Sequence, residues 1–229
     1  MEAPRPSPPA RGTRAAAVLA AFAATALDAA LLAWALGGIP ILLGHWRALA
    51  LLGVWFGGAL LLAIAQPVRA VEGTRRASDP LRILGLFVLP VATPPLAAWG
   101  ERLNLAMIPG GDARGWFGVA LAAAGLGLRI AAMAQLGSRF DPTIAILPGH
   151  ALESRGLYAR MRHPGYAGAW LAAAGAVLAF GSALGLIPLA LMAMLLGARA
   201  TDEERALREH FGGAWEAYRA RTGGFVPRL

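Results

Sequence analysis

Residues 164–199, PGYAGAWLAAAGAVLAFGSALGLIPLALMAMLLGAR, form an apolar stretch whose one charge is its last residue. As a single helix these 36 residues would be about 54 Å long, well beyond the roughly 30 Å hydrocarbon core of a bilayer. Small residues at Gly181, Ser182 and Gly185 interrupt the stretch near its middle. The sequence therefore predicts a tight hairpin of two membrane helices.

The rest of the chain also has the composition of a membrane protein. Of its 229 residues, 57% are hydrophobic and 15% are charged, against about a quarter charged in a typical soluble domain. Four further apolar runs precede the hairpin, at 15–37, 47–66, 81–100 and 115–136. We therefore expect an all-α integral membrane protein with about six transmembrane helices.

The two ends of the chain are polar in different ways. Residues 1–14 hold four prolines and three arginines with nothing to bury, which predicts a disordered tail. Residues 201–224 mix charged and apolar residues and end at a glycine pair, which predicts a cytoplasmic amphipathic helical tail after the hairpin.

The basic residues predict how the chain is oriented. All 21 are arginines, and 13 acidic residues leave a net charge of +8. Such an excess often indicates nucleic-acid binding, but in so apolar a chain the positive-inside rule explains it better. With the N-terminus inside, Arg47, Arg102 and Arg114 lie in outer loops and Arg129 lies within a span, which leaves 17 of the 21 inside. We expect a multi-pass protein of the inner (cytoplasmic) membrane with both termini in the cytoplasm, in contact with membrane lipids and not with nucleic acid.

Several kinds of chemistry are excluded by composition or spacing. The absence of cysteine excludes disulfides, thiolate catalysis and iron–sulfur clusters. The absence of lysine excludes Schiff-base chemistry and a P-loop lysine. No three of the four histidines have the spacing of metal ligands, so we expect no metal site.

Two polar clusters lie on either side of the hairpin. HALESRGLYARMRHPGY occupies residues 150–166, and RATDEERALREHFGGAWEAY occupies residues 199–218. Two antiparallel helices bring these segments to the same end, at the cytoplasmic boundary of the membrane. Their aromatic rings and carboxylates suit an organic cation, and a glutamate can accept two hydrogen bonds from a ribose diol.

The order of these pieces resembles that of a known family. GLYARMRHPGYAG at 156–168 is followed by the hairpin, then by R-x-x-x-E-E-x-x-L from Arg199, and then by FG and W-x-x-Y-x-x-R. This arrangement is similar to the integral-membrane methyltransferases related to isoprenylcysteine carboxyl methyltransferase and phospholipid methyltransferases. The resemblance covers roughly residues 120–227. It implies a methyltransferase core over 115–229 that uses S-adenosylmethionine, preceded by N-terminal transmembrane helices over 15–114.

The resemblance also implies roles for individual residues. Arg199 would face the methyl acceptor, a lipophilic small molecule, lipid or lipidated molecule with a carboxylate or an amine. An amine acceptor would need a base such as Glu204 or Glu203, whereas a carboxylate would need none. The residues implied to border the cofactor are His150, Ala151, Leu152, Glu153, Tyr158, His163, Pro164, Gly165, Tyr166 and Glu203.

Plainer interpretations of the same residues remain open at this point. Gly125 and Gly127 resemble a glycine motif of the phospholipid methyltransferases, but they are equally typical of close helix packing. Trp215 and Tyr218 are typical of aromatic residues at the headgroup level. Asp28, a carboxylate within the first span, is expected to pair with Arg129 or to be protonated.

Two other functions remain as alternatives. One is a membrane NADPH-dependent reductase of the sterol-reductase kind, which resembles these methyltransferases in its C-terminal half. The Glu203–Glu204 pair favours methyl transfer over reduction. The other is a non-enzymatic membrane scaffold or transporter, although the sequence contains no internal repeat of the kind that many transporters have.

Overall fold

The computed structural model describes residues 11–65, 74–75, 80–137, 145–146 and 152–228, and these are helical apart from one short pair of strands and the connecting turns. Residues 1–10 of the predicted tail lie outside the described part, and the first helix begins within the remainder of that tail. In chain order the elements are α1 (Arg11–Leu36), α2 (Ile39–Gly44), α3 (Trp46–Ala65), β1 (Thr74–Arg75), α4 (Pro80–Arg102), α5 (Gly111–Leu136), β2 (Ala145–Ile146), η2 (Gly156–Ala159), α6 (Pro164–Phe180), η3 (Ala183–Gly185), α7 (Leu186–Phe211) and α8 (Gly213–Arg221).

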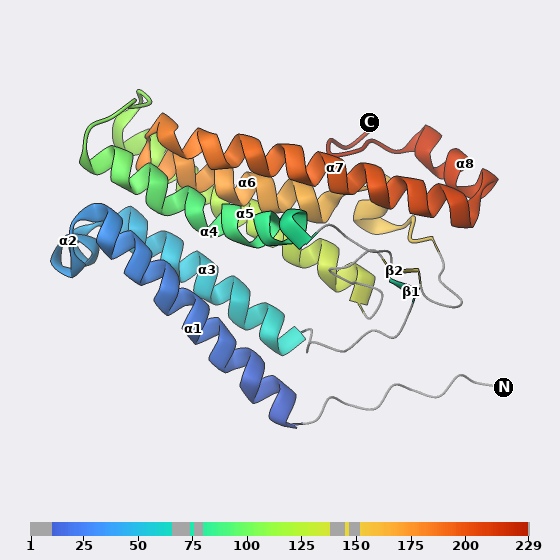
Figure 1. Ribbon diagram of the computed structural model, residues 1–229, viewed down its shortest axis with the longest axis horizontal. Helices are drawn as coiled ribbons and strands as arrows, with labels where there is room; N and C mark the ends of the chain where they lie inside the picture. The colour runs from blue at the N-terminus through green and yellow to red at the C-terminus, as the bar shows by residue number, and fades with distance from the viewer. Residues whose placement is uncertain (1–10, 66–73, 76–79, 138–144, 147–151, 229) are drawn as a thin grey trace.

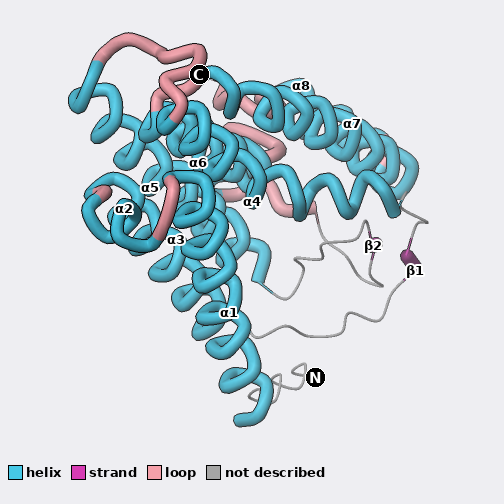
Figure 2. The backbone as a smooth tube through the Cα atoms, turned by 60° about the vertical axis from the view of Figure 1, so that its left-hand side comes forward, coloured by secondary structure: helices cyan, strands magenta, loops and turns pink. Residues whose placement is uncertain are grey.

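The long helices form a bundle of three layers. Helices α1 and α3 lie on one side, α6 and α7 lie on the other, and α4 and α5 lie between them (Figures 1 and 2). Among the described residues, five helices are long and apolar enough to cross a membrane, and α6 is a shorter apolar helix of 17 residues. The all-α membrane fold predicted from the sequence is confirmed.

The predicted hairpin is present and turns at the expected glycine. Helix α6 ends at Phe180, and Gly181 follows with φ 73°, a left-handed conformation that favours glycine. The space beside Gly181 is filled by the guanidinium of Arg114, so a side chain there would overlap it. After the short η3 turn, α7 returns alongside α6 (Figure 1).

Helix α7 is longer than the sequence pattern predicted. It runs without a break from Leu186 to Phe211, so the first half of the predicted tail continues the last membrane helix. The break comes at Gly212, with φ 50°, and α8 then forms a separate helix of 9 residues. Arg199, Glu203 and Glu204 therefore stand on the same rigid helix as the apolar residues of the hairpin.

Helices α5 and α6 approach one another more closely than side chains would allow. A Cβ atom added at Gly125 would lie 2.7 Å from the carbonyl oxygen of Gly168, and one added at Gly175 would lie 2.5 Å from that of Gly118. Such contacts between backbones are the usual means of helix association in membranes. The packing interpretation of Gly125 is thus confirmed, whereas a Cβ at Gly127 would meet no atom within 4 Å among the described residues.

At the end of the bundle opposite the two polar clusters, hydrogen bonds and ion pairs between side chains connect three of the helices. His45 Nε2 lies 3.1 Å from Glu101 Oε2, and His45 Nδ1 accepts the backbone N–H of Ala48, so the Nε2 atom is the donor to the carboxylate. Arg47 donates to Glu101 and to Asp112. These contacts join the starts of α3 and α5 to the end of α4.

The α5–α6 contact predicts a difference between two neighbouring glycines. Gly125→Ala should lower the free energy of unfolding by about 1–3 kcal/mol, because the added methyl must push two backbones apart. Gly127→Ala is the matched control and should leave the free energy of unfolding unchanged or slightly raised. Thermal unfolding in detergent measures both; equal melting temperatures for the two variants would contradict the close contact.

Candidate functional site

The two polar clusters of the sequence meet at one end of the bundle. His163 caps α6, whose first residue is Pro164, where no backbone donor is needed. Arg199, Glu203 and Glu204 lie on the returning helix α7. Since α6 and α7 are joined by the turn at the far end, the start of α6 and the last turns of α7 come side by side (Figure 1).

Glu204 is the centre of one group of contacts. Its Oε1 atom accepts hydrogen bonds from His163 Nε2 at 3.0 Å and from Arg162 Nε at 2.8 Å. Arg219 of α8 adds a longer ion pair, 3.9 Å from Oε2. The His163 side chain is only 3% exposed. A carboxylate contacted by one imidazole and two guanidinium groups in this way is well placed to fix their positions, because charge-assisted hydrogen bonds are the strongest in proteins.

Tyr166 connects a second group of contacts. Its hydroxyl donates to Glu203 Oε2 at 2.8 Å and accepts a hydrogen bond from Arg199 Nε, also at 2.8 Å. The tyrosine ring is stacked on the imidazole of His163, with 5.4 Å between ring centres and an angle of 2°. His163 Nδ1 lies 3.9 Å from Glu203 Oε2. The contacts around Tyr166 therefore adjoin those around Glu204 at His163.

The segment after α8 holds His163 and its neighbours from outside. We call residues 222–228 the C-terminal strap. Its backbone hydrogen-bonds to that of residues 160–163: Arg162 N–H donates to Gly223 O at 2.8 Å and His163 N–H to Gly224 O at 3.1 Å. The ring of Phe225 lies 5.4 Å from that of His163. His163 is therefore fixed by the strap as well as by Glu204.

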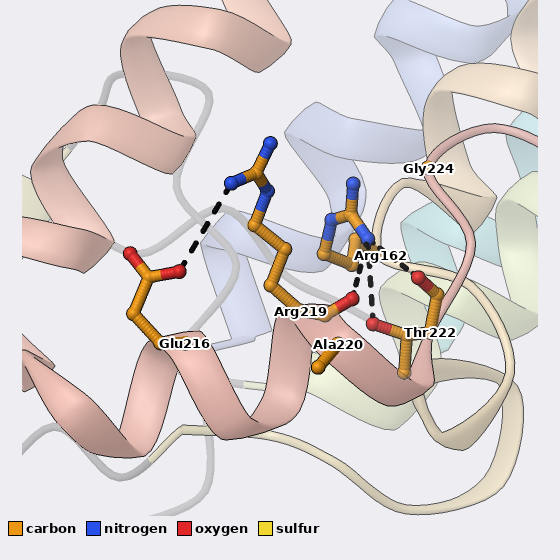
Figure 3. Close-up of a pocket in the computed structure, with 6 residues that line it drawn as sticks. All are labelled: Arg162, Glu216, Arg219, Ala220, Thr222 and Gly224. Atoms are coloured by element: carbon orange, nitrogen blue, oxygen red, sulfur yellow. Dashed lines mark hydrogen bonds and ion pairs between the residues drawn. The ribbon is translucent and has the colours of Figure 1, made fainter.

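A pocket of about 420 Å³ lies where the strap leaves α8 (Figure 3). Within it the guanidinium of Arg162 donates to the carbonyl oxygen of Thr222 at 2.6 Å, and Arg219 lies 4.0 Å from Glu216 (Figure 3). Arg162 and Arg219 line this pocket and also contact Glu204. The pocket therefore lies next to the contacts around Glu204. Its lining consists of Arg162, Glu216, Arg219, Ala220, Thr222 and Gly224.

The remaining residues implied by the resemblance are placed in part. Tyr158 lies next to the site, since its carbonyl accepts the Tyr218 hydroxyl at 2.8 Å, and its own hydroxyl lies 3.5 Å from Ala132 O. Leu152 is half-buried, and Glu153 has a nearly buried side chain and accepts from the backbone N–H of Arg155. His150 and Ala151 lie outside the described residues. Among the described residues, no group of three or more His, Asp or Glu could hold a metal ion.

Two aromatic residues of α8 differ from the sequence interpretation. Trp215 and Tyr218 are only 1% and 2% exposed, so they are core residues and not headgroup-level aromatics. Burial raises the pKa of Tyr218 to about 12, which keeps the hydroxyl protonated as the donor to Tyr158 O. Their spacing of three residues on an amphipathic helix is the signal that could have indicated a buried face.

Sequence reasoning also missed contacts that no local pattern encodes. It did not predict that Arg162 would bind Glu204, that Phe225 would cover His163, or that Arg129 would donate to the Gly165 carbonyl at 3.2 Å. A charged residue within a membrane helix was the one available signal, and it pointed to Arg129.

The C-terminal strap predicts unequal effects at its two glycines. A side chain at Gly223 would overlap the carbonyl oxygen of Val226, whereas one at Gly224 would meet only the end of the Arg162 side chain, at 3.6 Å. Gly223→Ala should therefore release the strap and expose the amides of Arg162 and His163. Hydrogen–deuterium exchange in peptides covering 157–166 and 219–228 should rise at least tenfold. Gly224→Ala is the control and should exchange like the parent; similar exchange in both variants would show that the strap does not hold this segment.

Comparisons with known proteins bear on the part of the chain that carries this site. Residues 118–209 match the sequence model of the isoprenylcysteine carboxyl methyltransferase (ICMT) family. A curated relative, the protein-S-isoprenylcysteine O-methyltransferase of Schizosaccharomyces pombe (strain 972 / ATCC 24843), is 32% identical over 105 residues. That alignment covers 44% of this chain and 44% of the relative, so the chain matches less than half of the relative's length.

The matched region includes the residues that the structure brings together at the end of the hairpin. It extends from α5 to α7 and contains His163, Tyr166, Arg199 and both glutamates. The resemblance predicted from the order of the motifs is confirmed: residues 118–209 carry the sequence pattern of the isoprenylcysteine carboxyl methyltransferase family.

Proposed function

We propose that this multi-pass membrane protein is an S-adenosylmethionine-dependent methyltransferase that methylates a carboxylate on a lipophilic or lipidated acceptor. The observation that carries the proposal is the hydrogen-bonded chain from Arg199 through Tyr166 to Glu203, beside the buried His163. The family match supports the proposal, because all three of these hydrogen-bonded residues lie within the matched region, 118–209. The name of the yeast relative supports an isoprenylcysteine-type acceptor.

The residues at the end of the hairpin suit S-adenosylmethionine. The stacked rings of His163 and Tyr166 and the carboxylate of Glu203 can attract a sulfonium cation by cation–π and Coulomb forces. Glu203 can also accept hydrogen bonds from a ribose diol. The bound cofactor would supply an electrophilic methyl group. The other residues proposed to border it are His150, Ala151, Leu152, Glu153, Tyr158, Pro164 and Gly165.

The contacts of the two glutamates favour a carboxylate acceptor over an amine. An amine would lose a proton during methylation, and Glu204 or Glu203 would have to accept it. Glu204 already accepts from His163 and Arg162, and Glu203 accepts from Tyr166. A carboxylate needs no base, so Arg199 would orient the acceptor and Glu204 would fix the positions of His163 and Arg162. Most of the acceleration would then come from positioning and from excluding water.

Cofactor binding provides the direct test. His163→Ala and Glu203→Ala should each weaken the binding of S-adenosylhomocysteine by about 10- to 150-fold, because one charged or hydrogen-bonded contact contributes about 1.5–3 kcal/mol. Isothermal calorimetry of the detergent-purified chain measures this. His210→Ala and Glu209→Gln, further along the same helix α7, are matched controls and should bind like the parent.

Two outcomes would overturn the proposal. If folded His163→Ala and Glu203→Ala bind S-adenosylhomocysteine as tightly as the parent, the cofactor site is elsewhere. If the parent binds NADPH and not S-adenosylhomocysteine, the reductase interpretation replaces methyl transfer.

We further propose that the candidate site faces the cytoplasm, where the cofactor is made, and that the chain lies in the inner membrane with both termini inside. The support is the distribution of arginines, 17 of 21 on the side of the candidate site. Reporter fusions after Gly38, Arg76, Asp112, His150 and Leu229 should read out, in, out, in and in. An external signal at His150 would contradict this orientation.

A further inference from the structure

The pocket beside the C-terminal strap is lined by donors that no described residue uses. Arg162 donates to Glu204 through Nε and to Thr222 through Nη1, but its Nη2 atom has no hydrogen-bond partner among the described residues. The guanidinium of Arg219 donates no hydrogen bond to the described part of the chain, and its ion pairs with Glu204 and Glu216 are 3.9 and 4.0 Å long. Both guanidinium groups line the pocket and point to the same side of α8 (Figure 3).

The acceptors around the pocket are already engaged. The carbonyl oxygen of Ala220 accepts from Arg228 Nη1, and Glu216 Oε1 lies 2.6 Å from Arg208 Nε. Among the described residues, the pocket and its immediate contacts thus include four arginines against two glutamates. A ligand that complements this surface must supply acceptor oxygens and negative charge.

A phosphate group meets both requirements. It carries several acceptor oxygens, and a guanidinium can bind it through two parallel hydrogen bonds. Gly224 leaves Arg162 Nη2 accessible, since even a Cβ atom added there would lie 3.6 Å from that nitrogen. The pocket volume of about 420 Å³ is in the range of ligand sites and has room for a phosphate with its neighbouring glycerol.

The pocket lies at the depth of the lipid headgroups. Helix α7 has 26 residues and is therefore about 39 Å long, some 9 Å longer than the roughly 30 Å hydrocarbon core. Its residues from Thr201 onward are mostly polar, so the excess length is at the end that leads into α8. The phosphates of membrane lipids occupy this headgroup region.

Two apolar side chains next to the pocket indicate which kind of phosphate compound fits. Phe225 and Val226 follow the pocket residue Gly224 and are 39% and 74% exposed. A water-soluble phosphate ester would leave them in water. The acyl chains of a lipid whose phosphate lies in the pocket would cover them, as membranes cover the apolar side chains of interfacial segments.

We propose that this pocket binds the phosphate of an anionic phospholipid through Arg162 Nη2 and Arg219, with the acyl chains against Phe225 and Val226. The recognised group is a phosphate, which lipids and soluble esters share, and the two apolar side chains favour the lipid. The inference does not depend on the proposed methyl transfer. Because Arg162 also binds Glu204 and the strap, the lipid would be held directly beside the candidate site.

Native mass spectrometry of the full chain in detergent provides the test. The parent should bind dioleoylphosphatidylglycerol about fivefold more tightly than dioleoylphosphatidylcholine, whose choline offsets the phosphate charge. Arg219→Gln should weaken phosphatidylglycerol binding about fivefold, whereas Glu216→Gln should strengthen it, because it removes a competing carboxylate. Both residues are exposed on α8, and loss of the fold cannot shift the affinity in opposite directions.

Arg221→Gln is the matched control. Arg221 is also an exposed arginine of α8, but its guanidinium lies over the ring of Tyr218, 5.9 Å from the centre, and does not line the pocket. This variant should keep phosphatidylglycerol affinity within about twofold. The inference is overturned if Arg219→Gln binds phosphatidylglycerol like the parent, or if Arg221→Gln weakens binding as much as Arg219→Gln does.

Competition with glycerol 1-phosphate identifies the source of the phosphate. Displacing the lipid should need a concentration at least about a hundredfold above that of the lipid, because the soluble ester buries no apolar surface. Val226→Ser should weaken lipid binding about threefold and leave binding of glycerol 1-phosphate unchanged. If glycerol 1-phosphate binds as tightly as the lipid, or if Val226→Ser leaves lipid affinity unchanged, the assignment to a lipid is wrong.

Discussion

The backbone contact between α5 and α6 is the constraint on which the candidate site depends. Lipid tails are as apolar as leucine, so helices in a membrane gain little from the hydrophobic effect and associate through close packing of small residues. Gly118 and Gly125 on α5 meet Gly175 and Gly168 on α6 at distances that exclude any side chain. This contact sets where α6 begins relative to α5. It thereby decides that Arg129 meets Gly165 and that His163 and Tyr166 stand at the end of the bundle.

Charge pairing organises what the helix contact positions. Burying charges is unfavourable unless each has partners, and removing one partner leaves the others uncompensated. Glu204 pairs with Arg162 and accepts a hydrogen bond from His163, and Glu203 reaches Arg199 through the Tyr166 hydroxyl. The two glutamates are neighbours in the sequence but belong to different groups of contacts. One group would hold the site together, and the other extends to the residues proposed to meet the acceptor and the cofactor.

The prediction that depended on one apolar segment of sequence was confirmed, whereas those that depended on contacts between helices could not be made from the sequence. The hairpin at Gly181 could be predicted because an apolar stretch has a maximum length in a bilayer, whatever surrounds it. Gly125 and Gly127 could not be distinguished in the sequence, because only the position of α6 makes one a contact and leaves the other open. Trp215 and Tyr218 were misjudged for a similar reason: they lie on the buried face of α8, and a local sequence pattern does not show which face of a helix packs against the rest of the protein.

The sequence by itself determined the class of the protein and the order of its motifs. Composition and the lengths of the apolar runs are enough to predict an all-helical membrane protein, and RHPGY followed by a hairpin and by Glu203–Glu204 is enough to indicate the family. The tertiary structure alone decided which charge meets which, from the binding of Arg162 to Glu204 to the approach of Arg129 and the cover of His163 by Phe225. Those contacts join residues up to about sixty positions apart, and periodicity along one helix says nothing about distances between helices.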